Sequence, residues 1–377
     1  MDLFKTLRGK VSKDNSKQNS QKSKKNWATF DKQFWYVFAI FLFFLFVICW
    51  FPFLFTQFSN VNYNLKEYGP LGDALNGIMG PFIAMLAAAL TFIAFWVQYK
   101  ANNQQRDDIN LERFENKFYE LVRMQNNTVD AFKIANEYSG RKVFLAMYNE
   151  LRFCFFSIKH ELEQVYHDHD QETLGFKKED DKEIFQIAYL IFFYGIGDIS
   201  DKLLQERLKN LCSPWFAGSI IRYLKKQGKG LHVLSMKDGA RLRYEAKYKP
   251  FDGHISRLGH YYRLLFQAVK FVNGNDILTK DEKYNYVKTL RAQLSAHEQV
   301  MLYYNTMTHL GEAWLAGVSR YDSLLIKYKM IKNIPLPLAD FGYPIQKEFE
   351  VEVKRYEEEN PGRKFYEWDG QEVETPK

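Results

Sequence analysis

The sequence predicts a mainly α-helical protein: a two-helix transmembrane hairpin followed by an α-helical cytoplasmic domain with a small β-hairpin. Two long uncharged apolar runs lie near the N-terminus, apolar residues then recur at helical spacing, and alternation is confined to short stretches. The 377 residues therefore divide into a basic cytoplasmic tail expected to be disordered (1–32), the hairpin (33–99), the helical domain (100–334) and an acidic C-terminal segment (335–377).

Each of the two apolar runs is long enough to cross a bilayer. Residues 33–65 and 74–99 carry no charge, and about 20 helical residues span the hydrocarbon layer. Aromatic residues at their ends, such as Trp50 and Trp96, are typical of the membrane interface. The preceding tail has nine basic and three acidic groups, a net charge of +6, whereas Lys66 is the only basic residue between the runs. Because positive charge favours the inner side, we expect a two-pass protein with both termini in the cytoplasm.

The second run carries small residues at intervals of four, namely Gly80, Ala84 and Ala88. Small residues allow helices to approach closely in lipid, so this span either forms a homo-oligomer or packs against the first span. Neither run contains an ionisable residue, which disfavours a proton relay or an ion-coupled transporter.

The region after the second run is predicted to be helical. Apolar residues and one glutamine follow steps of three and four, at Leu111, Phe114, Phe118, Leu121, Gln125, Val129 and Phe132. This stripe either faces the domain's own core or forms a coiled coil. Further helices are expected at 140–166, 183–195, 198–211, 254–273, 280–309 and 313–331.

Two stretches alternate apolar and polar residues instead. Residues 231–235 and 240–247 flank Lys237-Asp238-Gly239, a turn signal, which predicts a β-hairpin. Phe349, Val351 and Val353 alternate in the same way and indicate an extended segment.

The net charge of +7 comes mainly from two short segments, which excludes a uniformly basic nucleic-acid binder. The first is the tail, and the second is residues 222–249, with nine basic and two acidic groups. Its cations include Arg222, Lys225, Lys226, Arg241 and Arg243. Interleaved with tyrosines, they suit nucleic acid, anionic lipid headgroups or a phage-derived trigger; a solvated basic face is the alternative.

No standard signature of a nucleotide-binding, metalloprotease or serine-hydrolase enzyme is present, and the three cysteines share no CxxC spacing. We therefore expect neither a cofactor nor a metal. The acidic and histidine-rich stretch 167–170 could bind a metal, but a solvated loop explains it better.

Two groups of polar residues are candidates for a functional site. The first is His254, Arg257, His260, Tyr261 and Arg263, which could bind an anion or move a proton, or form a hydrogen-bonded seam between helices. The second is Arg291 and His297, a loose match to the catalytic pair of HEPN-type ribonucleases that also occurs by chance in helical proteins.

Several motifs together resemble a known family. They are Phe114 to Leu121, Gly140-Arg-Lys-Val-Phe144, Phe251-Asp-Gly-His254, Arg257-Leu-Gly-His-Tyr-Tyr-Arg263, Tyr286 to Ser295 and Glu298 to Asn305. Over residues 34–333 the chain resembles the bacterial phage abortive infection proteins, an AbiC-like family. The resemblance implies anti-phage defence from the bacterial cytoplasmic membrane and supplies no catalytic residues.

This resemblance leads to three functional hypotheses. The first is a membrane-anchored defence protein whose cytoplasmic domain senses infection and whose hairpin is the anchor or the effector. The alternatives are a membrane-tethered HEPN-like ribonuclease that uses Arg291 and His297, and a scaffold or adaptor that uses the basic segment. A non-enzymatic role is favoured.

Overall fold

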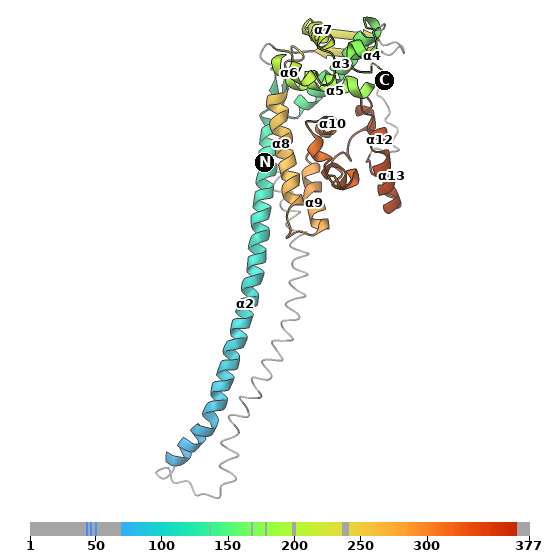
Figure 1. The fold of residues 1–377 in the computed structure, drawn as a ribbon. Helices are drawn as coiled ribbons and strands as arrows, with labels where there is room; N and C mark the ends of the chain where they lie inside the picture. The colour runs from blue at the N-terminus through green and yellow to red at the C-terminus, as the bar shows by residue number, and fades with distance from the viewer. Residues whose placement is uncertain are drawn as a thin grey trace. The chain divides into compact units, whose positions relative to one another are not determined.

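The computed structural model describes residues 43, 46, 50, 69–135, 137–166, 169–177, 179–197, 201–235 and 241–367. Over these residues the protein is mostly helical (Figure 1) and contains two small antiparallel strand pairs, β1 (Lys133–Ile134) with β2 (Tyr138–Ser139) and β3 (Gly230–Ser235) with β4 (Arg241–Ala246). The predicted helical character and the small β-hairpin are thus confirmed. The first apolar run lies almost wholly outside the described residues, so the two-helix hairpin stays a prediction. The chain divides into two units, Met1–Asp107 and Asp108–Lys377.

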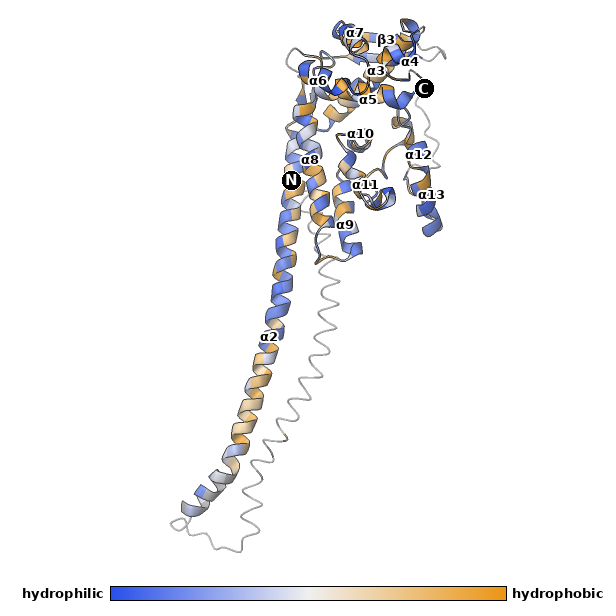
Figure 2. Ribbon diagram, in the orientation of Figure 1, coloured by the Kyte–Doolittle hydropathy of each residue, from blue (hydrophilic) through white to orange (hydrophobic). Residues whose placement is uncertain are grey.

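In the first unit, the described structure consists mainly of the start of one long helix, α2 (Gly69–Asp130). From Met79 onward this helix is long and apolar enough to cross a membrane, and the most apolar 18-residue window has a mean hydropathy of 2.0 with none of it buried. Figure 2 shows this hydrophobic stretch followed by a hydrophilic one. Large apolar side chains are exposed along it, including Phe82 at 62%, Met85 at 65%, Phe92 at 72% and Phe95 at 66%.

The second unit begins within α2 and continues, over the described residues, through helices of varied length and four short strands. In chain order these elements are β1 (Lys133–Ile134), β2 (Tyr138–Ser139), α3 (Lys142–Gln164), α4 (Gln171–Leu174), α5 (Asp181–Tyr194), α6 (Asp201–Leu208), α7 (Pro214–Lys225), β3 (Gly230–Ser235), β4 (Arg241–Ala246), α8 (Ile255–Asn273), α9 (Lys280–Arg291), α10 (Ala296–Thr306), η1 (Glu312–Trp314), η2 (Arg320–Asp322), α11 (Leu324–Lys327), η3 (Leu336–Leu338), α12 (Ile345–Glu348) and α13 (Glu350–Glu359).

Helices α3 and α5 pack together at the centre of the second unit's core. From Ile187 to Tyr194, helix α5 is apolar on every side and all of its residues are buried. The stripe on α2 also faces this core, because Phe118, Gln125 and Val129 are at most 3% exposed. Its own core, rather than a coiled coil, therefore explains the stripe.

The acidic C-terminal segment belongs to the same core. Phe341, Phe349 and Phe365 are at most 4% exposed and pack with the other core residues. The predicted extended conformation around Val351 is wrong, because Glu350–Glu359 form helix α13. Phe349 and Tyr356 are buried seven residues apart while Val351 is 76% exposed, which is the helical period. An alternation of three residues was too short to separate the two periods.

Two of the predicted helices are interrupted. The segment 280–309 forms α9 and α10, because Ser295 begins a new helix. Its side chain accepts a hydrogen bond from the Glu298 amide at 3.2 Å, and the Glu298 carboxylate accepts one from the Ser295 amide at 2.8 Å. This reciprocal capping box explains the break. Within 313–331, only Leu324–Lys327 are α-helical. Gly317 lies so near the following turn that a Cβ atom would be 2.9 Å from the Ser319 carbonyl oxygen.

The predicted hairpin is present as antiparallel strands β3 and β4, with Val233 opposite Arg243 and His232 opposite Tyr244. Leu234 and Tyr244 are buried, whereas Leu231 and Val233 are 67% and 50% exposed. One face therefore covers the core and the other faces solvent. The predicted turn at 237–239 lies outside the described residues.

Candidate functional site

A buried carboxylate, Glu298, is the centre of a polar cluster that we call the Glu298 centre, formed with Arg141, Tyr261 and Ser295. Glu298 is 1% exposed, and its Oε2 accepts hydrogen bonds from Arg141 Nη1 at 2.6 Å and from the Ser295 amide at 2.8 Å. Its Oε1 accepts from the Tyr261 hydroxyl at 3.2 Å. Glu298 lies in the first turn of α10, where the backbone dipoles stabilise negative charge. Burial, together with Glu298, raises the pKa of Tyr261, so this phenol stays a hydrogen-bond donor.

The Glu298 centre joins four separate parts of the second unit. Arg141 lies just before α3 and also donates to the Gln293 carbonyl, in the turn between α9 and α10, and to Asn126 Oδ1 on α2 at 3.0 Å. Asn126 in turn donates to Gln293 Oε1 at 2.7 Å. Tyr261 comes from α8. The Arg141–Glu298 ion pair is therefore a meeting point of four segments that carry the family resemblance, namely 140–144, 257–263, 286–295 and 298–305.

A second buried carboxylate is Glu150 on α3, which is fully buried. It accepts hydrogen bonds from the Tyr248 hydroxyl and from the Phe251 amide, the latter at 2.8 Å, and lies 3.1 Å from His254 Nε2. The chain between β4 and α8 is thereby fixed to α3. Burial and the charge of Glu150 both raise the pKa of Cys154, so this thiol is a core residue and not an activated nucleophile.

The predicted cluster on α8 is divided between these sites and the surface. His254 and Tyr261, at 2% and 0% exposed, belong to the Glu150 and Glu298 sites respectively. Arg257 is half-buried, and His260 and Arg263 are exposed. The two buried residues therefore fit the alternative of a hydrogen-bonded seam between helices. Anion binding by Arg257, His260 and Arg263 stays a prediction.

Arg291 and His297 lie on either side of the turn between α9 and α10. Arg291 is 5% exposed and donates to the carbonyls of Tyr328 at 2.8 Å and Lys329 at 3.1 Å. These bonds fix the chain after α11. His297 is half-buried, and burial lowers its pKa. Within the described part of the chain no hydrogen bond joins this pair, and a catalytic role for it stays a prediction.

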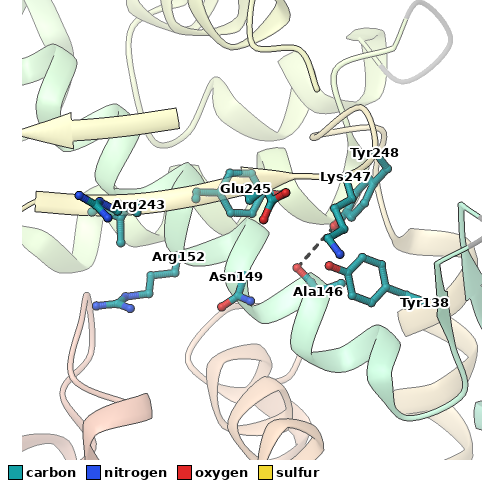
Figure 3. A pocket seen from close by; sticks show the side chains of 10 residues that line it. Tyr138, Ala146, Asn149, Arg152, Arg243, Glu245, Lys247 and Tyr248 are labelled. Carbon is teal, nitrogen blue, oxygen red and sulfur yellow. Dashed lines mark hydrogen bonds between the residues drawn. The ribbon is translucent and has the colours of Figure 1, made fainter. Parts of the chain in front are cut away.

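The predicted basic residues are all exposed: Arg222, Lys225 and Lys226 at the end of α7, and Arg241 and Arg243 on β4. Of these, Arg243 lines a cavity of about 240 Å³ between α3 and β4, together with Arg152, Lys247 and Tyr248 (Figure 3). Among the described residues, no group of three or more histidine, cysteine, aspartate or glutamate side chains is placed to hold a metal.

Sequence reasoning missed Arg141, Glu150 and Glu298 as site residues. The Ser295–Glu298 spacing is a capping-box signature and could have identified Glu298. Its ion-pair partner is 157 residues away, and no local pattern marks such a pairing.

Residues 253–338 match the family model described as putative phage abortive infection protein. The match supports an AbiC-like assignment. It covers α8 to α11 and includes Tyr261, Ser295 and Glu298 of the Glu298 centre, whereas Arg141 and Glu150 lie outside it. Neither a curated protein nor a solved structure matches the chain. The family description points to a role in phage abortive infection.

Proposed function

We propose that this AbiC-like protein is a phage-defence protein anchored in the bacterial cytoplasmic membrane, with its second unit sensing infection on the cytoplasmic side. Membrane anchoring is supported chiefly by the exposed apolar surface of α2. Its apolar window is unburied, and large apolar side chains such as Phe82, Phe92 and Phe95 are exposed along it. Monomeric soluble proteins rarely expose a continuous apolar surface along a helix of this length, and a bilayer would cover it.

The family match supports the defence role, and the orientation rests on the charge asymmetry of the sequence. The basic tail favours the cytoplasm, and a two-pass path then leaves the second unit on the same side. Oligomerisation through Gly80, Ala84 and Ala88 is one way in which sensing would reach the membrane. It stays a prediction.

Two arginines placed in the apolar stretch test this function. Ala88→Arg with Phe92→Arg adds two charges near the middle of the span, at a cost of roughly 2.5–3.5 kcal/mol each. Asn102→Arg with Gln104→Arg is the matched control, because it adds the same charges to exposed positions on the same helix beyond the apolar stretch. Both variants are expressed in bacteria that are then challenged with phage.

The expected result is that α2 of the first variant fails to insert, so that the second unit is no longer placed in the cytoplasm and phage protection is lost, whereas the control keeps insertion and protection. Full protection by a variant whose α2 is not inserted would refute the anchoring part of the proposal. Absence of protection by the intact chain against a broad set of phages would refute the defence part.

An adaptor role for the basic hairpin is the second candidate, favoured by its exposure. Arg241 and Arg243 lie on the same solvent face of β3 and β4 as Leu231 and Val233. If this face binds nucleic acid, Arg241→Glu with Arg243→Glu will abolish salt-dependent binding of an RNA oligomer, whereas Lys347→Glu on α12 will not. A ribonuclease is less well supported, because the Arg291 guanidinium is buried and bonded to backbone carbonyls.

A further inference from the structure

A cavity of about 460 Å³ lies in the second unit, between α9, the segment 320–329 and α13. We call it the lysine pocket. Its lining consists of Lys280, Tyr284, Tyr321, Asp322, Ile326, Lys327, Lys329, Tyr356, Asn360 and Phe365. Cavities of this volume commonly hold small-molecule ligands. The pocket is separate from the Glu298 and Glu150 sites and shares no lining residue with the cavity of Figure 3.

The pocket concentrates positive charge. Three lysines line it, and Asp322 is the one acidic residue among the lining residues. None of the three lysines forms an ion pair with any other residue that the structure describes. Lys327 donates to the Asn273 side-chain oxygen at 2.8 Å, and the Lys329 ammonium lies 3.7 Å from the centre of the Tyr356 ring. Both of these partners are neutral, so the positive charge is only partly offset, by Asp322 near Lys327 and by Tyr284 near Lys329.

More cations lie behind the lining. Partial burial, followed by the charges of Lys283 and Lys280, lowers the pKa of Lys327. Partial burial also lowers the pKa of Lys329, and nearby Lys332 and Arg291 act in the same direction. Like charges held this close repel one another, and a bound anion would relieve that repulsion.

Aromatic rings form another part of the wall. Tyr321 is held in place, since its hydroxyl donates to Glu359 at 2.7 Å and the Arg355 guanidinium lies 4.2 Å from its ring centre. Tyr356 packs edge-on against Phe365, with ring centres 5.6 Å apart. Tyrosine and phenylalanine faces stack on planar heterocycles with little dependence on sequence or base type.

We propose that the lysine pocket binds a nucleotide, with its phosphates held by Lys280, Lys327 and Lys329 and its base stacked against the tyrosine wall. Phosphate is the anion that clustered ammonium groups bind as point charges, and an aromatic base accounts for the rings beside them. Nucleotide binding goes beyond the proposed defence role and does not depend on membrane anchoring. It gives the second unit a small-molecule signal to which it could respond.

Equilibrium binding to the purified full-length protein tests the proposal. ATP and GTP are titrated separately, with adenosine and inorganic tripolyphosphate as half-ligand probes. We expect saturable binding of at least one nucleotide, more tightly than of either half-ligand. Lys280→Glu with Lys327→Glu, both exposed positions, should weaken binding of nucleotide and tripolyphosphate at least about tenfold. Lys347→Glu, an exposed lysine outside the pocket, is the control and should leave both unchanged.

Tyr321→Ala separates the two halves of the site. It should weaken binding of the nucleotide about fivefold to a hundredfold and leave binding of tripolyphosphate unchanged. Failure of both nucleotides to bind at millimolar concentration would overturn the proposal, as would binding that the two lysine substitutions leave unchanged. Equal binding of nucleotide and tripolyphosphate, indifferent to Tyr321→Ala, would also overturn it, because the site would then recognise phosphate alone. None of these results bears on whether the chain protects against phage.

Discussion

Replacing Arg141 with alanine should destabilise the second unit far more than removing an equally short ion pair at the surface. Arg141 and Glu298 are 2.6 Å apart, and so are Arg123 and Glu120. The difference is burial: the Glu298 side chain is 1% exposed, whereas the Arg123 and Glu120 side chains are 65% and 48% exposed. Water therefore replaces the lost partner of Glu120 but cannot reach Glu298 freely.

The expected cost follows from this difference. Removing one partner of a buried ion pair costs about 3–5 kcal/mol. The Arg141 side chain is 41% exposed, and the Ser295 amide and Tyr261 hydroxyl still donate to Glu298, so we expect about 2–3 kcal/mol. Arg123→Ala should cost about 0–0.5 kcal/mol, as exposed helical pairs do.

Thermal unfolding of the full-length protein measures both variants. Near-ultraviolet circular dichroism is the appropriate signal, because it reports the packing of buried tyrosines such as Tyr261 and Tyr303. At about 2–4 °C per kcal/mol for a unit of this size, Arg141→Ala should lower the melting temperature by about 4–12 °C and Arg123→Ala by less than about 2 °C. Equal shifts for the two variants would refute the argument that burial of Glu298 decides the energetics.

Two further predictions concern backbone geometry and pH. Gly253 has φ +87°, and an added Cβ atom would lie 2.5 Å from the Tyr194 carbonyl oxygen, so Gly253→Ala should cost at least about 2 kcal/mol. Gly218→Ala, in open space within α7, should instead stabilise by up to about 1 kcal/mol; denaturant midpoints that fail to separate the two would contradict this. Burial lowers the pKa of His297 in the folded state, so the unfolded chain binds more protons at low pH and stability should fall as the pH drops below about 6.5. His297→Gln should reduce this loss of stability at low pH, and an unchanged pH dependence of the unfolding midpoint would contradict the prediction. Because burial also lowers the pKa of His309, some loss of stability at low pH should remain in the variant.

Local signals in the sequence determine which parts of the fold could be predicted. The β3–β4 hairpin has alternation on both strands and a turn sequence between them, and both signals are short-range. The break between α9 and α10 was overlooked, although Ser295 and Glu298 mark it, because the apolar period continues across it. The segment 313–331 has helical spacing, yet the tight turn at Gly317 overrides it.

The residues of the candidate site likewise fall into those that a local sequence signal marks and those that it does not. His254 and Tyr261 were identified from one short helical segment, and both are buried polar residues with specific partners. The carboxylates that bind them are distant in sequence, with Glu150 lying 104 residues before His254. The lysine pocket is assembled from α9, the segment around Lys327 and α13, so no basic run marks it. Such sites depend on tertiary packing, and only a structure brings their parts together.

The central claim is that the chain is held in the membrane by the apolar stretch of α2. Alkaline carbonate extraction of membranes from phage-resistant cells that express the full-length protein tests it most directly. The account predicts that the intact protein stays in the membrane pellet. In a chain that lacks residues 33–65, so that only α2 can anchor it, the Asn102→Arg/Gln104→Arg control should stay in the pellet and Ala88→Arg/Phe92→Arg should be released. Release of the intact protein into the supernatant, with resistance retained, would contradict it.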